Sequence, residues 1–208
     1  GYEVFLAEEN PYLGGRVTRT NQYFPKLCPP SCGLEINFRR IKTNPNIKVF
    51  TCTEIESVSG EEGDFEVTLK VNPRRVNNNC TACGKCAEVC PVERPNDFNL
   101  GMDKTRAIYL PHFMAFPMKY VIDEAACLGE ECAKCVSACP YDAIDLGMAE
   151  EKVKIKVGAL IVATGWKPYD AGKIDNMGFG SFPNVVTNIM MERLASPDTD
   201  FKFLLLTS

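Results

Sequence analysis

The sequence lacks the features of a membrane-spanning protein and of a basic protein that binds polyanions. No apolar run approaches the roughly 20 residues that a helix needs to cross a bilayer, and the longest, Gly158 to Gly165, has the length of a strand. The formal net charge of −4 provides no basic excess for nucleic acid or an anionic membrane surface. The 208 residues, 45% of them hydrophobic, suffice for one large or two small packed domains.

Histidine is scarce, and a glycine-rich phosphate-binding loop is missing. His112 is the only histidine, and we expect a satisfied or exposed imidazole rather than a ligand or proton carrier. No G-x-G-x-x-G loop of a dinucleotide-binding fold occurs, and Gly178-Phe-Gly180 lacks the third glycine. The chain has no signal peptide and begins with Gly1 rather than Met, so we expect an N-terminal portion to be missing from it.

Cysteine, by contrast, is abundant, and eight of the eleven cysteines fall in two short runs. The first run has the spacing C-x2-C-x2-C-x3-C followed by proline, and the second repeats it with the first interval lengthened to four residues. The runs comprise Cys80, Cys83, Cys86, Cys90 and Pro91, then Cys127, Cys132, Cys135, Cys139 and Pro140. This spacing is that of iron–sulfur ligands.

The doubled run predicts two 4Fe–4S clusters with exchanged fourth ligands, because in two-cluster ferredoxins the last cysteine of each run binds the other cluster. We assign one cluster to Cys80, Cys83, Cys86 and Cys139, and the other to Cys127, Cys132, Cys135 and Cys90. Small neighbouring residues let backbone N–H groups approach the cluster sulfurs. Structural disulfides are an alternative, but the thiols suit a reducing cytoplasm. Zinc is another, although zinc sites usually pair two C-x2-C units.

Residues at the start of the chain suggest one edge of a dinucleotide-binding unit. Gly1 to Glu9 is predicted to form a short strand that ends in acidic residues. Glu8 at such a strand end would bind a ribose hydroxyl; a solvated strand end is an equal alternative. Gly14, Gly15 and Arg16 follow, and the glycines would let the backbone pass close to a ligand. A plain turn explains them as well.

Further along, the apolar spacing predicts mainly strands. A helix is expected from Leu34 to Thr43, ending near Pro45, and a strand from Ile47 to Thr53, followed by a turn region at Glu54 to Gly63. Asp64 to Val71 alternates apolar and polar residues, as does the segment that starts at Glu151. If these two strands pair, residues 73–150 form an insertion between neighbours in one sheet.

The chain after this insertion predicts a buried strand and a helix. Gly158 to Gly165 is fully apolar, which is typical of a parallel sheet buried on both faces. Its small terminal residues suit close approach of a cofactor. A helix is expected at Asn188 to Leu194 and another buried strand at Phe203 to Leu206. Within the insertion, Arg106 to Val121 is broken by prolines, and we expect extended segments packed over the clusters.

Cys28 and Cys32 stand outside the two runs. Their spacing is not C-x2-C, and buried thiols are the default interpretation. A redox-active pair and additional metal ligands are the alternatives.

Taken together, the segments VFLAEE…GGR, CPPSCG, the two cysteine runs and GALIVATGWKPYD resemble the HdrA-like family, the flavin subunits of heterodisulfide reductases and their relatives. The resemblance covers nearly the whole chain. It implies an α/β fold: an FAD-binding, thioredoxin-reductase-like domain of the Rossmann type that carries an inserted two-cluster ferredoxin-like domain. The implied boundaries are 1–72 for the first part of the FAD domain, 73–150 for the insert, and 151–208 for the second part and the start of a following domain.

The resemblance also implies roles for individual residues. Glu8 would hold the adenosine ribose, Gly14, Gly15 and Arg16 would lie along the FAD, and the backbone of Ile55 would contact adenine. Thr164, Gly165 and Trp166 would close over the flavin. The implied cofactors are therefore FAD and two 4Fe–4S clusters.

One branch of this family is similar in a longer segment, Tyr23 to Val49. It comprises the flavin and iron–sulfur subunits of the quinone-interacting membrane-bound oxidoreductase of sulfate reducers. The branch implies electron transfer between the quinone pool and adenylylsulfate reductase, with flavin, iron–sulfur and membrane cytochrome subunits as partners. It implies a cytoplasmic location, peripheral to the inner membrane through those partners. Two alternatives stay open: a heterodisulfide-reductase-type subunit that bifurcates electrons with ferredoxin, and a non-catalytic docking domain stapled by zinc.

Overall fold

The computed structural model describes residues 1–199, and the chain folds into two compact units. The first unit comprises Gly1–Leu13, Ile36–Arg94 and Thr105–Val162. The second comprises Gly14–Glu35, Pro95–Lys104 and the chain from Ala163 onward. None of the helices in the described part of the chain is long and apolar enough to cross a membrane.

The first unit begins with two parallel strands joined through a helix. Strand β1 (Val4–Ala7) pairs with β2 (Ile47–Phe50), which confirms the predicted strands there. Helix α1 (Pro30–Thr43) lies between them in the sequence and begins four residues before the predicted start at Leu34. Proline fits the first turn of a helix, since that position needs no N–H donor. The Phe38 ring of α1 stacks on Phe116 at 5.2 Å.

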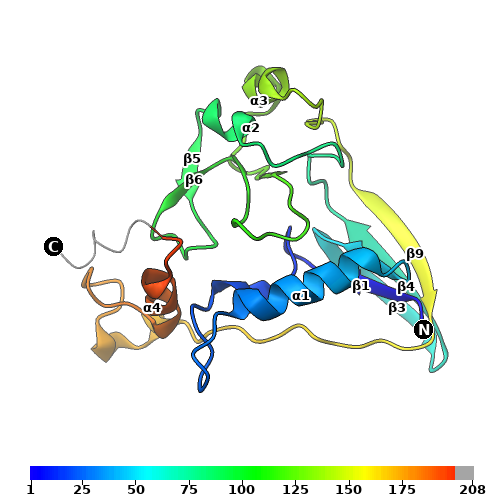
Figure 1. The fold of residues 1–208 in the computed structure, drawn as a ribbon, viewed down its shortest axis with the longest axis horizontal. Coiled ribbons are helices and arrows are strands. Elements are labelled where there is room, and N and C mark those ends of the chain that lie inside the picture. The colour runs from blue at the N-terminus through cyan, green and yellow to red at the C-terminus, as the bar shows by residue number, and fades with distance from the viewer. Residues whose placement is uncertain (200–208) are drawn as a thin grey trace. The chain divides into compact units, whose positions relative to one another are not determined.

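Three antiparallel strands form the largest sheet, in the order β3 (Thr53–Glu61), β4 (Asp64–Val71), β9 (Glu151–Val157) (Figure 1). Strands β4 and β9 pair along their whole length, so the prediction that these two alternating segments are neighbours is confirmed. The predicted turn region at Glu54–Gly63 is wrong, because most of it is strand β3. All of β3 after Thr53 is exposed. Because neither face of the strand is buried, its sequence does not alternate between apolar and polar residues, and the strand could not be recognised from that pattern.

Between β4 and β9 the chain leaves this sheet and forms short elements around an apolar core. They are α2 (Lys85–Glu88), β5 (Glu93–Pro95), β6 (Lys104–Arg106), β7 (Ile108–Tyr109), β8 (Val121–Ile122), the 3-10 helix η2 (Gly129–Glu131) and α3 (Lys134–Ala138). The core contains Val76, Cys86, Ile108, Ile122, Ala143 and Ile144. In the predicted extended region, only Arg106 and the short pair β7–β8 are strand.

In the second unit, short helical turns surround one α-helix. They are η1 (Gly15–Arg19), η3 (Ala171–Lys173), η4 (Asp175–Met177) and α4 (Asn188–Ala195). Helix α4 confirms the predicted helix, and its first turn is capped by the Thr187 hydroxyl, which accepts a hydrogen bond from the Met190 N–H. Arg193 is buried in this unit and donates to Asn99 Oδ1 at 2.9 Å.

The segment Gly158–Gly165 is not the predicted buried strand. It is irregular and exposed, with Ile161 93% and Val162 84% accessible. A parallel strand is buried only where neighbouring strands and covering helices enclose it. Within the described residues, β1 and β2 pair with each other alone. The predicted strand Phe203–Leu206 lies outside the described residues.

Core packing in β4 yields a stability prediction. Leu69→Ala should lower the free energy of unfolding by about 2–4 kcal/mol, because it removes a side chain that is only 2% exposed. Val58→Ala, on the exposed side of β3, should change it by less than about 0.5 kcal/mol. Urea unfolding followed by circular dichroism measures both, and equal effects would contradict this packing of the sheet.

Candidate iron–sulfur centres

Two hollows in the first unit are each lined by four thiols. The first hollow, of about 320 Å³ and partly open to solvent, has Cys80, Cys83, Cys86 and Cys139 in its wall. The second hollow, of about 340 Å³, has Cys90, Cys127, Cys132 and Cys135. Each hollow therefore takes three thiols from one run and the fourth from the other. The structure brings together the same two sets of four that the run spacing predicts.

The first run is bent by two residues with left-handed backbone conformation. Ala82 has φ 57° and Gly84 has φ 87°, and Gly84 forms the N-cap of α2. The first bend turns the Ala82 N–H toward the Cys80 sulfur at 3.5 Å. A left-handed backbone costs little free energy at glycine and is strained at other residues. The two bends close the run into a tight loop beside the first hollow.

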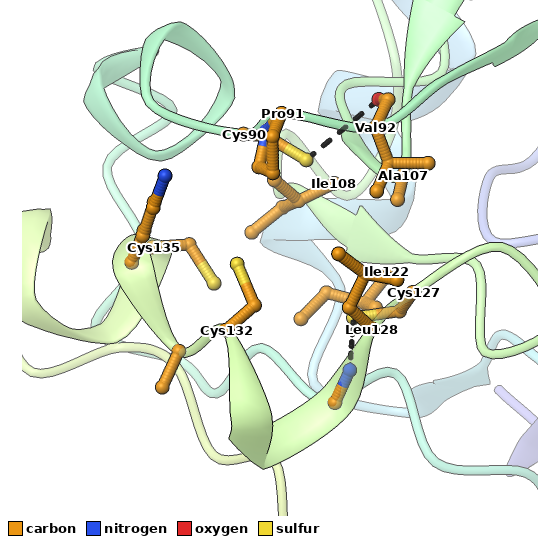
Figure 2. A pocket seen from close by; sticks show the side chains of 13 residues that line it. Cys90, Pro91, Val92, Ala107, Ile108, Ile122, Cys127, Leu128, Cys132 and Cys135 are labelled. Atoms are coloured by element: carbon orange, nitrogen blue, oxygen red, sulfur yellow. Dashed lines mark hydrogen bonds between the residues drawn. The ribbon is translucent and has the colours of Figure 1, made fainter.

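The second run repeats this geometry. Gly129 (φ 66°) and Ala133 (φ 39°) occupy the equivalent left-handed positions, and Ala133 is the N-cap of α3. The Gly129 N–H donates to the Cys127 sulfur at 3.4 Å. The two additional residues of this run are taken up by η2. Figure 2 shows the Cys132 and Cys135 side chains pointing toward the second hollow.

The exchange of fourth thiols follows from the packing of α2 against α3 (Figure 1). Cys90 and Cys139 each come shortly after one of these helices and reach the hollow formed by the other run. The Ala143 N–H donates to the Cys139 sulfur at 3.4 Å. An isolated bridge joins Val76 to Ile144, so the start and the end of the insert meet beside the first hollow.

Two of these thiols, Cys86 and Cys135, are reluctant to ionise. Mainly through burial, the pKa of Cys86 is raised to about 12 and the pKa of Cys135 is raised as well. A thiolate in these positions thus needs a metal cation to stabilise it, and metal binding would release protons. Apolar side chains such as Ile108 and Ile122 complete the wall of the second hollow.

The residues present fit 4Fe–4S clusters. Each hollow offers four soft thiol donors, which is the ligand set that such a cluster takes. Backbone N–H groups already point at three of the sulfurs. Within residues 1–199 no three His, Cys, Asp or Glu side chains converge as ligands of one metal ion. In a 4Fe–4S cluster four irons occupy alternate corners of a cube and each takes one thiolate, so four thiols spread around one hollow fit its ligand arrangement.

The residues implied in flavin binding divide between the two units. In the first unit, Glu8 directly follows β1, and its carboxylate accepts hydrogen bonds from the N–H and the side-chain amide of Asn10 at 2.9 and 2.7 Å. Ile55 lies in β3 and is more than half exposed. The Glu8 carbonyl accepts from the Thr53 N–H at 2.9 Å, so the end of β1 adjoins the start of β3.

In the second unit, Gly14 and Gly15 both have left-handed backbone conformation, with φ 99° and φ 50°. The Arg16 guanidinium lies over the Trp166 ring at 4.7 Å, so the structure brings these two predicted residues together. Thr164 and Gly165 lie in the exposed irregular segment before Trp166.

Three cysteines fall outside the hollows. Cys28 and Cys32 are exposed, so the default interpretation of buried thiols is wrong. Cys28 ends an irregular loop and Cys32 lies in the first turn of α1, where no apolar layer covers them. Cys52 was not singled out by its sequence context. It is half-buried beside Arg74, and burial raises its pKa against the opposing effect of that guanidinium.

Arg74 is the second residue that sequence reasoning missed. Its side chain is buried and donates to oxygen atoms on three different segments, around Pro11, Thr51 and Lys119–Tyr120. It stands in the polar stretch Asn72 to Asn79, where no apolar period distinguishes a buried arginine from an exposed one.

Comparison with known proteins supports the iron–sulfur interpretation. The family model described as "4Fe-4S binding domain" matches residues 73–93, which contain the first run. The chain is 39% identical over 201 residues to the iron–sulfur A-type subunit of the CoB–CoM heterodisulfide reductase of Methanocaldococcus jannaschii, covering 95% of this chain and 30% of that protein. It is 38% identical over 201 residues to the A-type subunit of the ferredoxin:CoB-CoM heterodisulfide reductase of Methanosarcina acetivorans, covering 93% and 25%.

A third relative is the A-type subunit of the H(2):CoB-CoM heterodisulfide,ferredoxin reductase of Methanothermobacter marburgensis, 35% identical over 207 residues, with 98% of this chain and 31% of that protein covered. The chain thus spans about a third or less of the length of these relatives. Nearly all of this chain is similar to one segment of the A-type subunits of heterodisulfide reductases.

Proposed function

We propose that this chain is an electron-transfer segment of a multi-subunit oxidoreductase and that its thiols hold two 4Fe–4S clusters. One observation carries the proposal: each of two hollows is walled by four thiols, three from one run and one from the other. The proposed ligands are Cys80, Cys83, Cys86 and Cys139 for one cluster, and Cys127, Cys132, Cys135 and Cys90 for the other. The proposed domain insert is residues 73–150.

When bound, such clusters carry single electrons, and the chain controls where and how easily they do so. The thiols would hold the two clusters beside one apolar core, against which several of them pack. N–H groups of Ala82, Gly129 and Ala143 donate to ligand sulfurs, which stabilises added negative charge. Most of the exposed wall of the second hollow is apolar.

We further propose that the full-length protein binds FAD next to these clusters. The proposed contacts are Glu8, Gly14, Gly15, Arg16, Ile55, Thr164, Gly165 and Trp166. A flavin exchanges two electrons with one partner and single electrons with another. The carboxylate at the end of β1 and the left-handed glycines suit a ribose and a close backbone approach, respectively.

The complex that contains this chain is proposed to be of the heterodisulfide-reductase type. The names of the relatives support this alternative better than the quinone-linked one, since the names include heterodisulfide and ferredoxin. Its partners would then be other flavin and iron–sulfur subunits. The quinone-linked proposal, with cytochrome subunits, adenylylsulfate reductase and a peripheral position at the inner membrane, rests on the resemblance of Tyr23 to Val49. Native copurification under anaerobic conditions separates the two proposals, because a membrane cytochrome partner would support the second.

The cluster proposal predicts a crossed pattern of loss among ligand variants. The anaerobically purified protein should contain about eight iron atoms in this segment, because each cluster carries four. Cys139→Ala should abolish the same electron paramagnetic resonance (EPR) signal as Cys83→Ala, although Cys139 lies in the other run. Cys90→Ala should instead abolish the signal that Cys132→Ala abolishes.

Cys28→Ala provides the matched control, since this exposed thiol lies outside both hollows. It should leave both signals intact. Colourless protein with zinc bound would refute the proposal in favour of a docking domain. Loss of signals by run, with Cys90 grouped with Cys83, would refute the exchange of ligands.

The flavin proposal predicts different effects for two neighbouring carboxylates. Glu8→Ala in the full-length protein should weaken FAD binding about tenfold, because hydrogen bonds to a charged group contribute about 1.5–3 kcal/mol. Glu9→Ala, at an exposed position, should leave the affinity within about twofold of the original. Fluorescence titration of the deflavinated protein measures both. Equal affinities of the two variants would contradict the role of Glu8.

A further inference from the structure

Arg74 connects the cluster insert to the strands that precede it. Its Nε donates to the Tyr120 carbonyl at 2.9 Å and one terminal nitrogen donates to the Lys119 carbonyl at 3.0 Å. The other terminal nitrogen donates to the Pro11 carbonyl at 2.7 Å and to the Thr51 hydroxyl at 3.2 Å. One guanidinium therefore holds the segment after Glu8, the segment after β2 and a wall of the first hollow.

The charge of this guanidinium is buried, and no acid among residues 1–199 neutralises it. It donates to carbonyl and hydroxyl oxygens and forms a hydrogen bond with the Cys52 thiol, and the ionisable groups that act on it are Cys52, Tyr109 and Cys80. Tyr120, whose carbonyl it binds, lines the first hollow together with Cys80. Lys119 is half-buried beside it, and burial and the Arg74 charge lower the pKa of Lys119.

Near the second hollow lies an arginine whose charge is neutralised. Arg94 follows Val92, a residue of its wall, and forms an ion pair with Asp123 at 3.0 Å. Asp123 itself follows the wall residue Ile122. The two additional residues of the second run are both acidic, Glu130 and Glu131, and the shorter first run has no counterpart to them. Each hollow also has one exposed lysine in its wall, Lys85 in the first and Lys134 in the second. The buried cation without an acidic partner among the described residues is therefore at the first hollow.

We infer that Arg74 is a positioning residue whose unneutralised charge gives the cluster bound by Cys80, Cys83, Cys86 and Cys139 a higher reduction potential than its neighbour. This inference rests on the proposed function. A buried cation stabilises the more negative, reduced state of a nearby cluster, because charges in a protein interior are poorly screened. The exposed Lys85 and Glu88 beside the same hollow are opposite in sign and screened by water.

The inferred order gives the segment a direction. An electron shared between the two sites is more stable in the first hollow, and Arg74 links the wall of that hollow to Pro11, three residues after Glu8. The thermodynamic gradient therefore runs from the second hollow to the side of the insert that adjoins the proposed flavin contacts in the first unit.

Redox titration of the anaerobically purified full-length protein, followed by EPR, tests the order without altering Arg74. Cys83→Ser and Cys132→Ser identify the two signals, since each changes one ligand set. The signal that responds to Cys83→Ser should titrate at the higher potential. The reverse order, or equal potentials, would overturn the inference. If neither variant alters an iron–sulfur signal, the proposed function itself has failed.

Three substitutions then test the cause. Arg74→Gln should lower the potential of the first site so that its ratio of reduced to oxidised cluster, at a fixed solution potential, falls about tenfold, which equals 59 mV for one electron. Arg74→Lys loses the same fork of hydrogen bonds but keeps the charge, so it should lose stability without this shift. Asp123→Asn should unmask Arg94 and raise the potential of the second site, while its amide oxygen still accepts from the Ala125 and Ala126 N–H groups.

Arg75→Gln is the matched control, because Arg75 forms an ion pair with the exposed Glu124 at 2.7 Å. It removes one positive charge from the adjacent position and should leave both potentials unchanged. An Arg74→Gln protein that retains both clusters at their original potentials would overturn the inference. If the Arg74→Gln protein loses a cluster, the inference is decided by the order of potentials in the unaltered protein and by the shift in Asp123→Asn. An Arg75→Gln shift as large as that of Arg74→Gln would also count against a specific role of Arg74.

Discussion

The exchange of one cysteine between two runs is the constraint on which the insert depends. Because Cys90 lines the hollow of the second run and Cys139 that of the first, α2 and α3 must pack together and the two loops must face different spaces. The short β-strands of the insert are too small to fold alone, since isolated two-residue ladders provide little stability. The proposed clusters would supply the missing free energy by joining segments that are far apart in the sequence.

The three-stranded sheet provides the second constraint. Strand β9 returns to pair with β4 along seven residues, which brings the two ends of the insert side by side. Insertion between neighbouring strands is tolerated because the ends of the inserted segment already lie close together. Arg74, which follows β4 closely, then ties the insert to the segments after β1 and β2 by donating to carbonyl and hydroxyl oxygens, with no acid among its described hydrogen-bond acceptors.

Relatives of this chain are, by name, subunits of reductases, and the chain corresponds to about a third or less of each. The two hollows, each lined by four thiols, suit a component that passes electrons onward, because they could hold redox groups in an apolar surrounding. In such a component the protein controls position, polarity and local charge, whereas the cofactors supply the chemistry. The unequal charge around the two hollows is one way in which a single insert could impose a direction on that transfer.

The sequence by itself determined the features that depend on local spacing. The cysteine intervals predicted the two sets of four thiols, the alternation of β4 and β9 predicted their pairing, and the amphipathic pattern predicted α1. Prediction from the sequence failed where pairing with other strands decides the structure. Strand β3 forms because β4 pairs with it, and Gly158–Gly165 is irregular because no strand among the described residues pairs with it. Only the tertiary structure revealed that Cys28 and Cys32 are exposed and that Arg74 is buried, since burial depends on contacts between residues distant along the chain.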